Sequence, residues 1–183
     1  MKNFLKKNIL LCVTGGIAAY KSAELTRLFK KEGADVRIVM TESAKEFITP
    51  LTLQAVSGNQ IHDSLLDEKA EAAMGHIELA KWADIILIAP CTADSLSKIT
   101  HGRADDLMGA LILATKASIF IAPAMNMNMW LDPSTQDNYK TLLSRQINFI
   151  GPNDGEQACG DVGPGRMSEP HEIIDLINAS FAK

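Results

Sequence analysis

The sequence predicts an α/β protein in which one parallel sheet carries helices on both faces. Short apolar runs are nearly continuous, as in strands that are buried on both sides, and amphipathic helical stretches separate them. The chain has 183 residues, of which 46% are apolar, so it can bury a sizeable core. We therefore expect a single domain over residues 1–183.

Five apolar runs are expected to form the strands, at residues 9–13, 36–40, 85–89, 119–122 and 147–150. Between the first two runs, Leu25, Leu28 and Phe29 have the spacing of one helix face. Gly33 follows them as a stop signal. A similar apolar stripe after Pro170 predicts a C-terminal helix.

Composition and charge exclude several function classes. The net charge is −4 and the basic residues are scattered, so we expect no nucleic-acid partner. No apolar run reaches the roughly 20 residues needed to cross a bilayer. The lysine-rich start leads into a short strand and then a turn rather than a signal-peptide cleavage site, so a cytoplasmic location is expected.

The three cysteines are too few and too irregularly spaced for a disulfide framework or a zinc site, so no metal is expected. Cys12 lies inside a predicted strand and is expected to be buried. Cys91 is expected in the wall of a ligand cleft.

Four segments follow predicted strands and should meet at one edge of the sheet. Right-handed crossovers place such loops together, and ligands bind outside the carboxyl ends of parallel strands. The segments are residues 14–17, 41–43, 90–95 and 123–126. Their convergence predicts the functional site.

The first three of these segments carry groups that suit an anion. Gly15 and Gly16 allow a tight turn before a helix whose N–H groups can hold a phosphate, although a plain turn is equally consistent. The G-x-G-x-x-G fingerprint of dinucleotide sites is missing. Hydroxyls at four positions can either donate to a phosphate or cap the next helix: Thr41, Ser43, Thr92 and Ser95.

Three side chains are candidates for chemistry. His76 follows a glycine and precedes a helical pattern, so it is either a base at a helix start or a structural histidine. Asn126 comes directly after a buried strand, where its amide needs a partner such as a ligand carboxylate. The surrounding methionines can also be core filler.

Cys159 lies in a long segment, about residues 151–167, that is rich in glycine and lacks periodicity. Such a segment is expected to be a functional loop rather than part of the core. A mobile lid that brings a thiol over a substrate fits this composition better than a buried cysteine does.

These segments resemble the flavin-dependent cysteine decarboxylases, from the turn at Thr14 to residues 165–167. Residues 123–130 match the family's P-x-M-N-x-x-M-W motif in full, and residues 158–161 read Ala-Cys-Gly-Asp. Residues 75–79 are similar to the family's catalytic histidine region. One position departs from the family: Asp94 stands where the motif P-A-S-A-N-T has asparagine, and it loses an amide donor.

The resemblance implies a flavodoxin-like or Rossmann-like sheet and FMN bound between subunits of a trimer or a multiple of trimers. It implies the decarboxylation of phosphopantothenoylcysteine to phosphopantetheine, a step of coenzyme A synthesis. In that reaction the substrate is oxidised to a thioaldehyde with FMN, loses carbon dioxide, and is reduced again from the enethiol.

The resemblance also implies roles for individual residues. His76 would be the catalytic base, Cys159 the acid on the lid, and Asn126 the group that holds the substrate carboxylate. Met129 and Ala158 complete the expected substrate site. The expected FMN-binding residues are Gly15, Gly16, Ile17, Thr41, Ser43, Thr92, Ala93, Asp94, Ser95 and Ala124.

Two other functions stay open from the sequence. A relative that decarboxylates the C-terminal cysteine of a peptide would share the flavin site and the asparagine motif. A non-catalytic FMN-binding regulatory subunit would share the fold, although such relatives carry long acidic tails. In many bacteria this kind of domain is fused to a synthetase, and the sequence does not decide between a stand-alone enzyme and such a domain.

Overall fold

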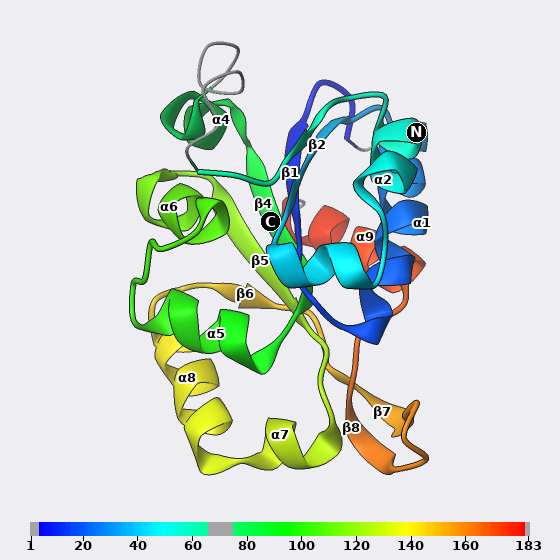
Figure 1. Ribbon diagram of the computed structural model, residues 1–183, viewed down its shortest axis with the longest axis vertical. Helices are drawn as coiled ribbons and strands as arrows, with labels where there is room; N and C mark the ends of the chain where they lie inside the picture. The colour runs from blue at the N-terminus through cyan, green and yellow to red at the C-terminus, as the bar shows by residue number, and fades with distance from the viewer. Residues whose placement is uncertain (1–3, 66–74, 182–183) are drawn as a thin grey trace.

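A six-stranded parallel sheet forms the centre of the computed structural model, which describes residues 4–65 and 75–181 (Figure 1). The strand order is β3-β2-β1-β4-β5-β6, the order of a Rossmann-type sheet. The strands are β1 (Asn8–Val13), β2 (Asp35–Met40), β3 (Ile61–His62), β4 (Ile85–Cys91), β5 (Ser118–Pro123) and β6 (Asn148–Phe149). The expected fold class is confirmed. The sequence missed only β3 in this sheet, since Ile61 and His62 are not part of an apolar run.

Helices cover both faces of the sheet. One face carries α1 (Lys21–Lys31), α2 (Pro50–Ser57) and α9 (Pro170–Phe181), and the other carries α4 (His76–Trp82), α5 (Ala93–Thr100), α6 (Leu107–Ala114) and α8 (Pro133–Ser144). Short helices η1 (Ile17–Tyr20), η2 (Glu42–Glu46) and α7 (Met127–Leu131) follow β1, β2 and β5. Within the described ranges, no helix is long and apolar enough to cross a membrane.

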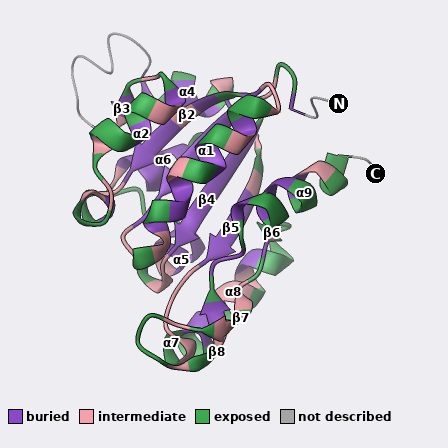
Figure 2. Ribbon diagram, turned by 90° about the vertical axis from the view of Figure 1, so that its right-hand side faces the viewer, coloured by how far each residue is buried: buried purple, intermediate pink, exposed green. Residues whose placement is uncertain are grey.

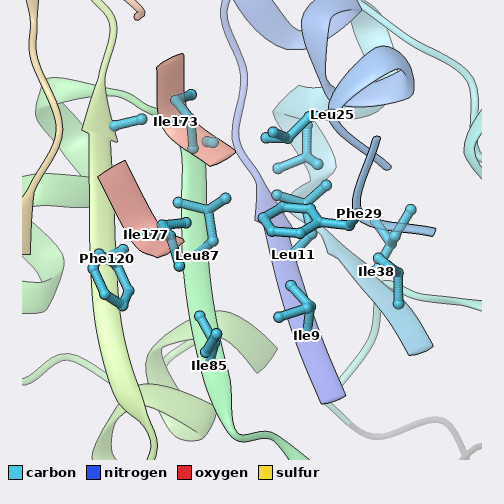
Figure 3. Packing of buried hydrophobic residues seen from close by; sticks show 14 of the residues in the cluster. Ile9, Leu11, Leu25, Phe29, Ile38, Ile85, Leu87, Phe120, Ile173 and Ile177 are labelled. Atoms are coloured by element: carbon cyan, nitrogen blue, oxygen red, sulfur yellow. The ribbon is translucent and has the colours of Figure 1, made fainter. Parts of the chain in front are cut away.

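The strand residues divide between two hydrophobic clusters, one on each face. On β1, Ile9 and Leu11 pack with Leu25 and Phe29 of α1, while Leu10 points to the opposite cluster (Figure 3). The strands are buried almost throughout, whereas the outer faces of the helices are exposed (Figure 2). This double burial explains why the strands read as continuous apolar runs.

The order in which strands are added to the sheet reverses between β1 and β4, which pair in parallel at its centre. One hydroxyl joins their carboxyl ends: Thr14 Oγ1 donates to Pro90 O at 2.8 Å and accepts from Thr92 N at 3.2 Å. Ser22, at the start of α1, donates to Ala89 O at 3.0 Å. A crevice at such a reversal is the usual ligand site of a doubly wound sheet.

The segment expected as an irregular loop, residues 151–167, is instead mostly an antiparallel hairpin. Its strands are β7 (Asn153–Glu156) and β8 (Val162–Arg166). Glycines weaken strand propensity, and neither strand has a continuous buried face, so the hairpin leaves no alternating apolar signal. Figure 1 shows it beside α7, below the carboxyl ends of the sheet strands.

The turns after β1 and β2 touch at Gly15. A Cβ at this position would lie 2.5 Å from both Cβ and Oγ of Ser43. At Gly16, whose backbone is extended, an added Cβ would meet only Thr92 Cγ2 at 3.9 Å. The close approach therefore depends on the first glycine and not on the second.

Gly15→Ala is expected to lower the free energy of unfolding by about 1–3 kcal/mol, because the methyl group overpacks the contact with Ser43. The matched variant Gly16→Ala should change it by less than about 1 kcal/mol. Urea unfolding followed by circular dichroism measures both values. Equal losses in the two variants would show that the approach of the two turns is not tight.

Candidate active site

A cavity of about 960 Å³ lies between the turn after β1 and the hairpin β7–β8. This volume is near the upper end for small-molecule sites, which span roughly 300–1,000 Å³. The structure brings most of the predicted site residues to its wall. They are Gly15, Gly16, Ile17, Ser43, Thr92, Ala93, Asp94, Ala124, Asn126, Met129, Ala158 and Cys159.

Two of the predicted residues line a smaller neighbouring cavity of about 300 Å³, namely Thr41 and Ser95. Ser43 and Asp94 border both cavities, so the two spaces adjoin. Lys98 also lines the smaller cavity and lies 3.5 Å from the Asp94 carboxylate. The negative charge that replaces the family's asparagine therefore has a nearby lysine.

The hydroxyl of Thr92 caps a helix. Its Oγ1 accepts from Ser95 N at 3.2 Å and donates to Ser95 Oγ at 3.0 Å, which fixes the start of α5. Ser43 does not cap η2; its Oγ lies 3.2 Å from Thr41 Oγ1. Of the two uses that the sequence left open, capping thus applies to Thr92 alone among these side chains.

Asn126 lies at the end of β5 and uses both ends of its amide. Its Oδ1 accepts from Asn128 N at 2.8 Å and so caps α7. Its Nδ2 donates to Asp161 Oδ2 at 2.8 Å and lies 3.4 Å from both Gln157 Oε1 and Cys159 Sγ. The cap fixes the orientation of the amide and aims its N–H groups at the hairpin.

Cys159 is exposed at the tip of the hairpin, close to Asn126. Its Sγ donates to Asp161 Oδ2 at 3.3 Å. The hydrogen bond from Asn126 and, after it, the one from Cys159 hold the pKa of Asp161 below its usual value. At neutral pH the Asp161 carboxylate is therefore anionic and accepts from both side chains.

The hairpin packs closely on the segment that carries Asn126. Gln157 joins the two: its Oε1 accepts from Met127 N at 3.0 Å, and its Nε2 donates to Pro164 O at 3.1 Å. Gly165 O accepts from Met125 N at 2.9 Å. The segment expected to be a lid thus borders the cavity as a strand pair with specific contacts.

Sequence reasoning missed several polar side chains of the site. Gln157 and Asp161 flank Cys159 in the sequence, and their polarity in a glycine-rich segment was the available signal. Lys21 and Arg166 line the cavity as cations and both contact Glu169, at 2.7 and 3.5 Å. Lys21 also donates to Met167 O at 3.2 Å and so ties α1 to the end of the hairpin. No sequence pattern pairs Lys21 with partners so far away in the chain.

His76 does begin a helix, as predicted, but it is not among the described residues that line either cavity. It is half-buried at the start of α4, on the face of the sheet covered by α6. The structure therefore does not bring His76 to the cavity wall with Asn126 and Cys159.

The prediction for Cys91 was wrong. Its side chain is fully buried with Cys12 in the core rather than exposed in the cavity wall, because β4 extends one residue beyond the cis proline and keeps it inside. Burial raises the pKa of Cys12 to about 12 and raises that of Cys91 as well, so both remain neutral thiols. In the part of the chain that is described, no group of three or more His, Cys, Asp or Glu side chains could hold a metal.

Known proteins resemble this chain along its whole length. The sequence profile of the Flavoprotein family matches residues 2–182. The coenzyme A biosynthesis bifunctional protein CoaBC of Vibrio cholerae is 59% identical over 182 residues, which is 100% of this chain and 46% of that protein. The chain thus spans less than half the length of the bifunctional relatives that it matches.

Solved structures give the same result. A cysteine-to-serine mutant of PPC decarboxylase, complexed with pantothenoylaminoethenethiol, is 33% identical with a TM-score of 0.85; the match covers 97% of this chain and 100% of that one. The FMN binding protein AtHal3 is 34% identical with a TM-score of 0.82, over 97% of each chain. The chain therefore belongs to the flavoprotein family that includes PPC decarboxylase.

Proposed function

We propose that this chain is an FMN-dependent decarboxylase that removes the cysteine carboxyl group of phosphopantothenoylcysteine, in coenzyme A synthesis. The observation that carries the proposal is the meeting of Asn126 and Cys159, 3.4 Å apart, over a cavity floored by the glycine turn after β1. The names of its relatives, a PPC decarboxylase and CoaBC proteins, support the same substrate. A cytoplasmic location and a single domain with the hairpin as its lid are part of the proposal.

The residues of the cavity suit FMN. The turn at Gly15 and Gly16 leads into a continuous helical segment, and such a helix start favours one phosphate group. Ile17 and Ala124 offer apolar surface for a ring, and the volume leaves room for a substrate beside the cofactor. When bound, FMN supplies the reversible two-electron oxidation of the carbon that bears the thiol.

The side chains of this protein would bind and orient the substrate and move its protons. The N–H groups of Asn126, aimed by the cap on α7, would hold the substrate carboxylate. Cys159 would give a proton to the product late in the reaction, and Met129 and Ala158 would pack beside the substrate. The closed hairpin would keep water from the reacting carbon.

His76 would remove a proton early, acting from a neighbouring subunit of a trimer or a multiple of trimers. Two features support this arrangement. His76 lies away from the cavity of its own chain, and large apolar side chains around the cavity are exposed, with Ile17 at 65% and Tyr20 at 61%. Exposed apolar surface of this kind would suit an interface between chains.

Cys159→Ser and His76→Asn are expected to block different halves of the reaction. Each should lower turnover by at least about 100-fold, the usual contribution of a general acid or base. Under anaerobic conditions with phosphopantothenoylcysteine, the Cys159 variant should lose the visible absorbance of oxidised flavin and the His76 variant should keep it. Full turnover by Cys159→Ser, or loss of the absorbance in both variants, would contradict the assigned roles.

Mixing the two inactive variants tests the shared site. A heterologous trimer interface would combine His76 of one chain with Cys159 of the next, so hybrids co-expressed in equal amounts should regain about a quarter of wild-type activity. Each variant alone gives the baseline. Hybrids that stay inactive, while sedimentation shows that they assemble, would mean that the two side chains act within one subunit.

A further inference from the structure

A carboxylate beside the cavity makes contacts to which no role has yet been assigned. Asp161 Oδ2 accepts from Asn126 Nδ2 at 2.8 Å and from Cys159 Sγ at 3.3 Å. One oxygen atom of the protein thus engages both the amide proposed to hold the substrate carboxylate and the thiol proposed as the acid.

Asn126 offers a ligand carboxylate only the donors of its NH₂ group, because its amide oxygen can only accept. Its Oδ1 is used by the backbone N–H of Asn128, so only its NH₂ group can meet a ligand carboxylate. That group already donates to Asp161, and its remaining neighbours, at 3.4 Å, are Gln157 Oε1 and Cys159 Sγ. A ligand carboxylate must therefore displace Asp161 or lie against its negative charge.

We propose that Asp161 is a built-in competitor of the substrate carboxylate: it occupies the Asn126 amide in the free site and lowers affinity only for ligands that carry a carboxylate. This inference rests on the proposed function, because it concerns the same amide and the same substrate group. Asp161 acts through Asn126 and is a positioning residue rather than a catalytic one.

The competition between the Asp161 carboxylate and the substrate carboxylate ends when carbon dioxide leaves. Hydrogen bonds to a charged acceptor are stronger than those to a neutral one, so the Asp161 carboxylate holds the amide well while the site is free. A substrate carboxylate replaces one anionic acceptor with another. After carbon dioxide leaves, the product has no group to compete, and Asp161 returns to the amide. The competition from Asp161 thereby lowers the affinity for the substrate relative to that for the product, so the substrate carboxylate does not bind too tightly.

Two unreactive ligands isolate this effect. Phosphopantothenoylalanine keeps the carboxylate and lacks the thiol, and the corresponding N-ethyl amide lacks both. Isothermal titration calorimetry of the FMN-loaded protein gives the dissociation constant of each ligand, with no turnover involved.

Asp161→Asn should tighten binding of the alanine ligand by about fivefold, because the competing hydrogen bond loses its charge while its shape is kept. Binding of the ethyl ligand should change by less than about twofold, within the usual context dependence of one contact. Asp161→Ala, which removes the acceptor altogether, should act in the same direction on the alanine ligand.

Glu156→Gln is the matched control. Glu156 lines the same cavity from the same hairpin, and in the described part of the chain its side chain does not hydrogen-bond to Asn126. This variant removes an equal charge without freeing the amide, so it should leave the preference between the two ligands unchanged.

Three results would overturn the inference: weaker or unchanged binding of the alanine ligand to both Asp161 variants, an equal gain in Glu156→Gln, or an equal gain for the ethyl ligand. In each of these cases the proposed substrate stands, because the wild-type protein still binds the ligands. If the wild-type protein binds neither ligand, the proposed substrate fails, and the inference fails with it.

Discussion

The site depends on one buried hydroxyl between β1 and β4, where the order of the strands in the sheet reverses. Thr14, 1% exposed, links the carboxyl ends of β1 and β4 through Pro90 O and Thr92 N. These two ends must stay together for the glycine turn and the start of α5 to share one cavity wall. Every other group of the site is placed relative to this wall: the turn after β2 through Gly15, and the hairpin through the end of β5.

The hairpin adds the second half of the site and is joined to the rest of the molecule by several polar contacts. Gln157 and Asp161 reach the segment after β5, and Lys21 holds the other end of the hairpin through Met167 and Glu169. Hydrogen bonds that are partly open to water each contribute little net free energy, about 1 kcal/mol. If the hairpin acts as the proposed lid, contacts of this kind let it open for a ligand at low cost and close with a defined geometry.

The strands and their order along the chain could be predicted from the sequence because they depend on burial. The four longer strands, β1, β2, β4 and β5, are largely buried on both faces and therefore read as apolar runs. The turns that follow the strands converge because a parallel sheet brings them to one edge. The hairpin was missed because its glycines leave no periodic pattern, and Cys91 was misplaced because a one-residue extension of β4 moves it into the core. The position of His76 outside the cavity wall could not be read from a motif, since a motif carries no information on where its residues lie in the fold. The partner of Asn126 was equally hidden, because Asp161 lies 35 residues away in the sequence.

We propose that this protein decarboxylates a cysteine in its cavity with FMN as a recycled cofactor. The most direct measurement is the carbon dioxide released when the purified, FMN-loaded chain is mixed with phosphopantothenoylcysteine in excess. We expect carbon dioxide and phosphopantetheine in equal amounts over many turnovers, with the flavin fully oxidised at the end. A chain that binds FMN and the substrate but releases no carbon dioxide would contradict the claim.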